Sequence, residues 1–183
     1  MIRNKKIQVI YGDITRQKVD AIVNAANESL LGGGGVDGAI HSAAGKKLEL
    51  ACKYIHDERG GCKTGSAVIT TGGNLPAKFV IHAVGPIWRG GMYQESDLLF
   101  RAYLNSLRLA SENKIKIIAF PNISTGIYNF PKKQASKIAV STVVDFLNNN
   151  KTSIKKIIFV CFDQENFELY KELVFNTLKI TTL

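Results

Sequence analysis

Hydrophobic residues along the chain fall into short apolar runs that alternate with longer stretches of helical spacing. A short apolar run bounded by glycine, proline or polar residues is typical of a strand, whereas apolar positions recurring every three or four residues predict a helix. The runs predict strands at residues 7–11, 21–23, 67–71, 79–84, 115–120 and 156–162. The periodic stretches predict helices at residues 36–44, 47–55, 95–113, 135–146 and 166–177. The polar stretch 57–65, with its three glycines, predicts a loop.

Strands that alternate with helices predict an α/β layer fold with a largely parallel sheet. In such folds ligands bind beyond the carboxyl ends of the strands. Three polar or glycine-rich segments follow predicted strands there, at residues 12–15, 24–37 and 124–128. The length of 183 residues fits one domain, so we expect a single domain over residues 1–183.

The composition agrees with an ordinary globular protein, because 45% of the residues are hydrophobic and 21% are charged. No apolar run approaches the ~20 residues of a membrane helix. The first apolar run meets Asp13 too early to be the core of a signal peptide. We therefore expect a cytoplasmic protein without a membrane partner.

Metal and disulfide chemistry find little support in the sequence. The three cysteines are an odd number and form no CxxC motif, so neither a disulfide framework nor a zinc site is predicted. The three histidines do not share a metal-ligand spacing: they are His41, His56 and His82. No metal and no cofactor is expected.

The formal net charge of +9 favours an anionic partner, either a nucleotide or a nucleic acid. The lysines, however, form scattered pairs rather than a basic stripe interleaved with aromatic residues, and no RRM or KH motif is present. Scattered pairs are typical of solvated surface. Nucleic acid is therefore disfavoured as the main partner.

Four consecutive glycines, residues 32–35, are the most informative feature of the chain. Glycine weakens a regular element by about 0.5–1 kcal/mol relative to alanine, but it lets a ligand approach bare backbone amides. The run precedes the predicted helix 36–44, whose amino terminus attracts anions. It therefore predicts a phosphate cradle, and a mobile surface loop is the alternative.

Two other phosphate-binding motifs fit poorly. Gly33, Gly35 and Gly38 satisfy the dinucleotide fingerprint GxGxxG, but residues 25–31 intervene between the strand and the motif, which should follow its strand directly. The acidic residue needed ~20 positions later could only be Asp57 or Glu58. A Walker A loop is excluded because Cys62 stands where its last glycine is required, before a Lys-Thr pair.

Asp37 lies in the first turn of the helix that follows the glycines. A carboxylate there can simply complement the helix dipole, typically by ~0.3–1 kcal/mol. Two residues past an anion cradle, however, it would repel phosphate. A role as a base or a water-holding group beside the ligand explains it better.

Polar side chains in the neighbouring segments complete a candidate site. Asp13 suits an Asx turn or helix cap, or an acceptor for the exocyclic amine of a base such as adenine. Asn24 and Asn27 flank two alanines, and amides can bind hydroxyl groups as donors and acceptors. Residues 124–128, Ser-Thr-Gly-Ile-Tyr, suit a second phosphate, with Tyr128 as an apolar lid over a sugar.

These motifs together resemble the macrodomain family, in its MacroD-type branch, which includes bacterial O-acetyl-ADP-ribose deacetylases. The resemblance covers residues 7–170, and its most specific part is GGGVDGAIH at 33–41. The other matching motifs are GDIT (12–15), NAAN (24–27), LPA (75–77), VGP (84–86) and ISTG (123–126). Family members often have glycine where Asn129 stands, and a small residue in place of Asn122. Because asparagine tolerates the left-handed conformation, we expect the loop to keep its shape.

The resemblance implies a three-layer α/β/α sandwich around a mixed, mostly parallel sheet, with ADP-ribose in a deep cleft. It assigns Asp37 as the catalytic carboxylate and Asn27 as its partner at the distal ribose. It implies that Asp13 accepts a hydrogen bond from the adenine amino group, with the backbone of Ile14 beside it. We predict that Phe162 makes an apolar contact to adenine. Gly12 is implied as a ligand contact as well. The contacts implied to diphosphate and ribose are Gly34, Gly35, Val36, Ser124, Thr125, Gly126, Ile127 and Tyr128.

Two functions follow from this resemblance. A hydrolase would use Asp37 to activate water without metal, on O-acetyl-ADP-ribose or on mono-ADP-ribose ester-linked to acidic side chains of proteins. A binding module would only hold ADP-ribose, but such readers tend to lack the acid after the Gly-Gly-Val element. Asp37 therefore favours the hydrolase.

Overall fold

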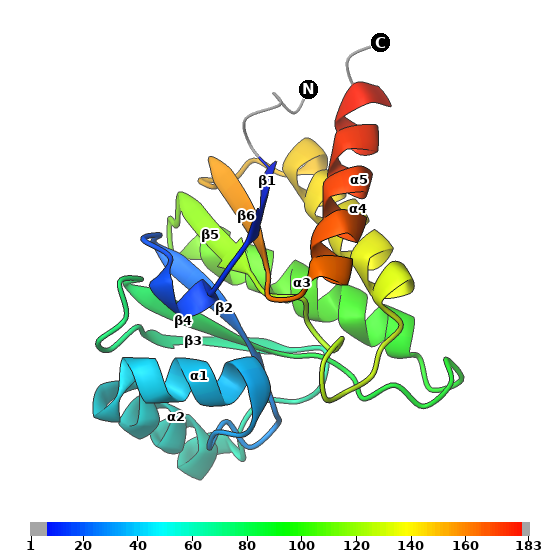
Figure 1. The fold of residues 1–183 in the computed structure, drawn as a ribbon. Helices are drawn as coiled ribbons and strands as arrows, with labels where there is room; N and C mark the ends of the chain where they lie inside the picture. Colours follow the sequence, from blue (N-terminus) through cyan, green and yellow to red (C-terminus); the bar gives the residue numbers. More distant parts are fainter. Residues whose placement is uncertain (1–6, 181–183) are drawn as a thin grey trace.

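A computed structural model describes residues 7–180 as one mixed sheet covered by helices (Figure 1). The strands are β1 (Ile7–Tyr11), β2 (Ala21–Ala26), β3 (Ala67–Thr71), β4 (Phe79–Val84), β5 (Ile117–Phe120) and β6 (Lys156–Cys161). Their spatial order is β1-β6-β5-β2-β4-β3. Every neighbouring pair is parallel except β3 and β4, which are antiparallel at one edge. The predicted mixed, mostly parallel sheet is confirmed.

Helices cover both faces of this sheet. They are α1 (Gly35–Ala44), α2 (Lys46–Arg59), α3 (Glu95–Glu112), α4 (Lys132–Asn149) and α5 (Gln164–Ile180), with a 3₁₀ turn, η1 (Ile14–Arg16), after β1. Figure 1 shows α1 and α2 on one side of the sheet and α3, α4 and α5 on the other. The three-layer α/β/α sandwich is therefore confirmed. Among the described residues, no helix is both long and apolar enough to cross a membrane.

Each face of the sheet has its own hydrophobic core. Because successive side chains of a strand point to opposite faces, neighbouring residues of β2 serve different cores. Val23 packs with residues of α3, α4 and α5, and Ile22 packs with residues of α1 and α2. All residues of β2 except the half-buried Ala25 are buried, and the strand lies between β5 and β4, so it fixes where the glycine loop begins.

Several boundaries differ from the prediction. The amide-bearing segment after residue 23 continues β2 to Ala26, because ladder pairing with β4, including Asn24 with His82, outweighs its polar character. Residues 57–59, predicted as loop, continue α2, which ends at Gly60 in the left-handed conformation (φ +75°). β5 begins at Ile117, and β6 ends at Cys161. The predicted single domain over 1–183 includes residues 1–6 and 181–183, which lie outside the described residues.

Candidate active site at the carboxyl edge of the sheet

The segments that follow β1, β2, β5 and β6 meet at one edge of the sheet, because these four strands are parallel. Together with the first turn of α1 they line a cleft of about 600 Å³. Of the residues that the sequence placed in the site, Asn24 does not line this cleft. The others do: Gly12, Asp13, Ile14, Asn27, Gly34, Gly35, Val36, Asp37, Ser124, Thr125, Gly126, Ile127, Tyr128 and Phe162. The volume is in the range of clefts that bind small molecules and cofactors.

The glycine loop brings bare backbone to the cleft wall, where side chains on the loop would crowd their neighbours. A Cβ on Gly33 would lie 3.0 Å from Asp37 Oδ2, and one on Gly34 would lie 3.1 Å from Ile127 Cδ1. Gly38 lies one turn into α1, and a Cβ there would lie 2.5 Å from the carbonyl oxygen of Gly33. Gly34 caps α1 without a side-chain bond, so the first amides of the helix remain available to a ligand.

Asp37 is almost fully buried, with 4% of its surface exposed, yet it lines the cleft. Its Oδ1 accepts a hydrogen bond of 2.6 Å from Asn24 Nδ2, and His41 Nε2 lies 3.5 Å from the same oxygen. Its Oδ2 has no hydrogen-bond partner among the described residues. A buried carboxylate oxygen without a partner is costly, so the cleft has a strong acceptor ready for a water molecule or a ligand hydroxyl.

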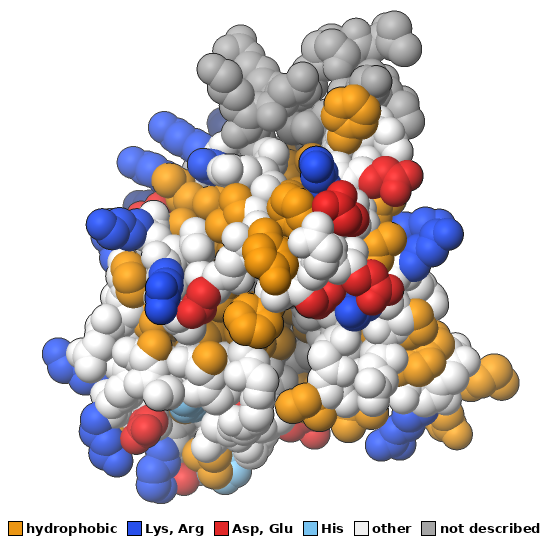
Figure 2. Space-filling model, viewed as in Figure 1, with side chains coloured by type: hydrophobic (Ala, Val, Ile, Leu, Met, Phe, Trp, Pro, Cys, Tyr) orange, Lys and Arg blue, Asp and Glu red, His pale blue; other side chains and the backbone are white. Residues whose placement is uncertain are grey.

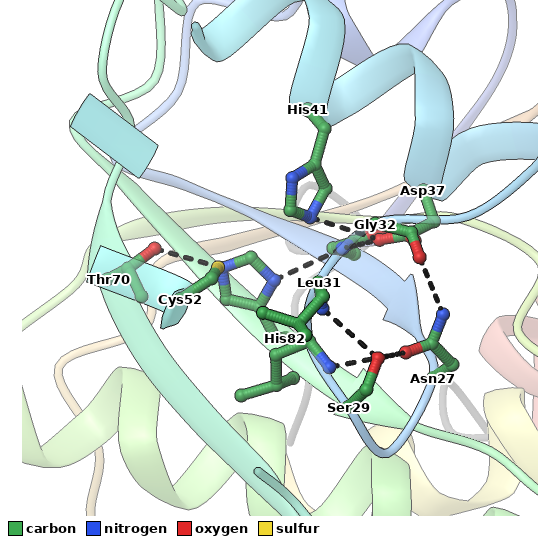
Figure 3. Close-up of polar contacts among 11 residues, drawn as sticks. Asn27, Ser29, Leu31, Gly32, Asp37, His41, Cys52, Thr70 and His82 are labelled. Carbon is green, nitrogen blue, oxygen red and sulfur yellow. Dashed lines mark hydrogen bonds and ion pairs between the residues drawn. The ribbon is translucent and has the colours of Figure 1, made fainter. Parts of the chain in front are cut away.

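Asn27 is held by its own loop (Figure 3). Its Nδ2 donates to the carbonyl oxygen of Gly32 at 2.9 Å. Its Oδ1 accepts from Ser29 Oγ at 2.7 Å and from the backbone amide of Leu30 at 3.2 Å. The oxygen is therefore committed, and one Nδ2 hydrogen remains for a ligand. Asn27 can therefore donate a hydrogen bond to a sugar hydroxyl but cannot also accept one, whereas the sequence led us to expect both roles.

At the opposite end of the cleft, Asp13 has the helix-cap role that the sequence offered, and one of its oxygens remains for a ligand. Its Oδ1 caps η1 by accepting from the backbone amide of Thr15 at 2.8 Å and from the Thr15 hydroxyl at 2.7 Å. Its Oδ2 lies 3.7 Å from Arg16 Nε and is the oxygen left to meet a ligand. Phe162 is 82% exposed, so its ring is free to cover an apolar or aromatic group.

The second loop, residues 124–128, closes the cleft from the other side. Ser124 has a left-handed backbone (φ +66°), and its buried Oγ has no partner among the described residues. Burial raises the pKa of Tyr128, and the charges of Asp37 and Glu28 raise it further, so its hydroxyl stays protonated and can donate. Asn129 has φ +54°, which confirms that asparagine keeps the loop in the left-handed conformation.

Side chains from three elements converge behind Asp37, which the spacing of the histidines did not reveal. His41, Cys52 and His82 place potential ligand atoms within 4.8 Å of one another. Hydrogen bonding argues against a metal there. Asn24 Nδ2 faces His82 Nδ1 at 3.1 Å, so Nδ1 must accept and the proton lies on Nε2, the nitrogen that faces the cysteine. Burial raises the pKa of Cys52 to about 12, which keeps the thiol protonated.

The cleft has further lining residues that were not predicted from the sequence. Asn166, only 1% exposed, lines the cleft from the first turn of α5, and its Oδ1 has no partner among the described residues. Gly85 lines the cleft too, and a Cβ there would lie 2.2 Å from Ser124 Oγ. The VGP motif offered a signal for Gly85. Nothing in the local pattern distinguishes Asn166 from a surface residue of a helix.

The fold and the cleft define an α/β domain that presents backbone amides and a buried carboxylate to one small ligand. The chain matches the family model described as Macro domain over residues 23–139. It is 57% identical over 169 residues to an O-acetyl-ADP-ribose deacetylase of Escherichia fergusonii, covering 92% of this chain and 95% of that protein. The chain belongs to the macro domain family.

Two solved structures have the same fold. The Oceanobacillus iheyensis macrodomain with ADP superimposes with a TM-score of 0.91 at 40% identity, covering 98% of this chain and 95% of that one. The Trypanosoma brucei macrodomain in complex with ADP-ribose gives a TM-score of 0.82 at 38% identity, covering 92% of this chain and 68% of that one.

Proposed function

We propose that this protein is a hydrolase that binds ADP-ribose and removes the acetyl group from O-acetyl-ADP-ribose. The relative at 57% identity carries the name O-acetyl-ADP-ribose deacetylase, and the related structures hold ADP and ADP-ribose. The observation that carries the proposal is Asp37 Oδ2, a buried acceptor without a partner beside the glycine loop. A module that only held a diphosphate would gain nothing from a carboxylate there.

In the proposed complex, Asp13, Ile14 and Phe162 hold the adenine. The amides of residues 34–36 and loop 124–128 hold the diphosphate, and Asn27 donates to the distal ribose. Asp37 Oδ2 accepts a hydrogen bond from a water molecule that attacks the ester. The water oxygen bonds to the carbonyl carbon of the acetyl group, and the bond between that carbon and the ribose oxygen breaks. The ribose oxygen takes up the proton that the water gives up, so ADP-ribose with a free hydroxyl and acetate leave. Because the ribose is fixed beside that water, positioning supplies much of the rate enhancement.

Substitution of Asp37 tests this assignment. Asp37→Ala and the isosteric Asp37→Asn should each lower the rate of acetate release by about 100-fold or more, the effect typical of losing a positioned base. Calorimetry should show ADP-ribose affinity within a few-fold of wild type, because the remaining contacts persist. Turnover unchanged in both variants would refute the role of Asp37. ADP-ribose binding by wild type without acetate release would favour a binding module instead.

A second substrate, mono-ADP-ribose ester-linked to acidic side chains of proteins, is supported by a pocket beyond Tyr128. This pocket of about 470 Å³ shares Tyr128 and Gly85 with the cleft. It therefore offers room, next to the reacting end, for a leaving group larger than acetate. A side-by-side assay of O-acetyl-ADP-ribose and mono-ADP-ribosylated protein, with Asp37→Ala as the blank, tests this. Release of acetate alone would limit the protein to the small ester.

We also propose, from the sequence, that the protein acts in the cytoplasm.

A further inference from the structure

A line of buried side chains runs from Asp37 through the sheet to the strand β3. Asn24 on β2 contacts Asp37, His82 on β4 contacts Asn24, and Thr70 on β3 contacts His82. Asn24 and His82 are fully buried and Thr70 nearly so. Asn24, His82 and Thr70 do not line the cleft. In Figure 3, His82 and Thr70 lie to the left of Asp37, whereas Asn27 lies below it on the right.

The chemistry of each contact fixes the direction of the hydrogen bonds. Asp37 Oδ1 is an acceptor, so the nitrogen end of the Asn24 amide must face it, at 2.6 Å. The same nitrogen lies 3.1 Å from His82 Nδ1, which must therefore be the unprotonated nitrogen of the ring. His82 Nε2 then carries the hydrogen and donates to Thr70 Oγ1 at 2.9 Å, with the weaker acceptor Cys52 Sγ at 3.6 Å. The Thr70 hydroxyl donates onward to the carbonyl oxygen of Thr71 at 3.1 Å.

The orientation of Asn24 depends on these two acceptors alone. Its Oδ1 is buried and has no hydrogen-bond partner among the described residues, so nothing holds the amide from its oxygen side. If the proton of His82 moved to Nδ1, two donors would face each other across 3.1 Å. Rotation of the amide would relieve that clash but would turn its oxygen toward the carboxylate of Asp37. The tautomer of His82 therefore decides whether Asp37 keeps its donor.

We propose that Thr70 is a positioning residue for catalysis: by accepting from His82 Nε2 it sets the tautomer that keeps Asn24 donating to Asp37. This inference rests on the proposed function of Asp37 and goes beyond it, because Thr70 lies on the edge strand and does not line the cleft. Burial lowers the pKa of His82 to about 3, with a further contribution from His41, so the ring is neutral and has a defined tautomer near neutral pH. The isosteric change Thr70→Val removes this acceptor and suits a strand, so the fold is retained.

The turnover number of Thr70→Val should fall about 3- to 10-fold, the effect of one hydrogen bond. The dissociation constant of ADP-ribose, measured by calorimetry, should stay within about twofold, because that bond holds Asp37 and not the diphosphate. Thr70→Ser keeps the hydroxyl and should restore wild-type turnover. Thr142→Val is the matched control, since the buried Thr142 hydroxyl bonds only to its own helix, at the carbonyl oxygen of Ile138. It should leave turnover unchanged.

The tautomer is read directly from ¹⁵N–¹H correlation spectra of the histidine rings, which need no activity. Wild type and Thr70→Ser should show His82 protonated at Nε2 only, whereas Thr70→Val should populate the Nδ1-protonated form. Wild-type His82 protonated at Nδ1, or unchanged turnover in Thr70→Val, would overturn the proposal. A parallel loss of ADP-ribose affinity would also overturn it, because that is the mark of a general structural defect. If wild type released no acetate, the proposed function would fail, while the tautomer measurement would still stand.

Discussion

At the scale of single residues, the site depends on how closely backbone segments approach one another. Gly38 is the sharpest case. Alanine normally stabilises a helix by about 1 kcal/mol relative to glycine, but a Cβ on Gly38 would lie 2.5 Å from the backbone oxygen of Gly33. The helix and the glycine loop can therefore meet only at a residue without a side chain. The same approach holds Gly33 against Asp37.

Gly38→Ala should lower the free energy of unfolding by about 1–3 kcal/mol, the range for a side chain forced into a filled space. It should also weaken ADP-ribose binding, because displacing Gly33 disturbs the proposed diphosphate cradle. Urea denaturation and calorimetry measure the two effects. Gly12→Ala is the stability control, since a Cβ on Gly12 meets nothing within 4 Å. A Gly38→Ala protein as stable as wild type would show that the glycine loop around Gly33 can move aside at little cost in free energy.

At the scale of elements, the amino terminus of α5 brings Asn166 into the cleft. Asp163 Oδ1 accepts from the backbone amide of Asn166 at 2.9 Å, and Oδ2 accepts from Asn166 Nδ2 at 2.8 Å. Lys132 of α4 lies 3.1 Å from the same carboxylate. Burial raises the pKa of Asp163, but these bonds and the ion pair outweigh it and leave the pKa below its usual 3.8. Asp163 therefore caps α5 as a carboxylate and orients Asn166.

Asp163→Ala should lower the free energy of unfolding by about 1 kcal/mol, the usual effect of losing a helix cap, whereas Asp163→Ser should keep most of it. Because the folded pKa is lowered, the contribution of the charged form is complete above the usual 3.8 and disappears as the pH falls through the folded value. The difference between wild type and Asp163→Ala should therefore shrink in urea titrations at acid pH. A difference that stays constant with pH would show that the carboxylate charge contributes nothing.

The helices, strands and site residues also differ in how far they could be predicted from the sequence. Strong periodicity and glycine punctuation located the strands and helices, and the cradle with Asp37 followed from glycines placed before a helix. Asn24 was predicted in a loop because its polarity hides its place in β2, which only pairing with β4 reveals. The convergence of His41, Cys52 and His82 depends on packing between α1, α2 and β4, so no spacing along the chain encodes it.

At the scale of the whole molecule, the charge of +9 raises the question of a nucleic-acid partner. On the face shown in Figure 2, lysine and arginine side chains are spread around the outline, with acidic and apolar side chains between them, and form no continuous stripe. Two cations at the cleft are paired with acids: Arg16 with Asp13, and Lys132 with Asp163 and Glu165. A dispersed field of this kind attracts polyanions weakly and without a binding groove.

Binding of a single-stranded oligonucleotide should therefore be detectable only at low salt and should disappear by about 200 mM, because it would come from counterion release alone. ADP-ribose binding should change little over the same range, since short contacts inside a cleft are screened less than exposed charges. Fluorescence anisotropy with a labelled oligonucleotide and calorimetry with ADP-ribose, both at 50 and about 200 mM salt, measure the contrast. An oligonucleotide affinity that persisted at the higher salt would require specific contacts and would revive a nucleic-acid function. Loss of that affinity would leave ADP-ribose, bound in the cleft, as the anionic partner that the net positive charge favours.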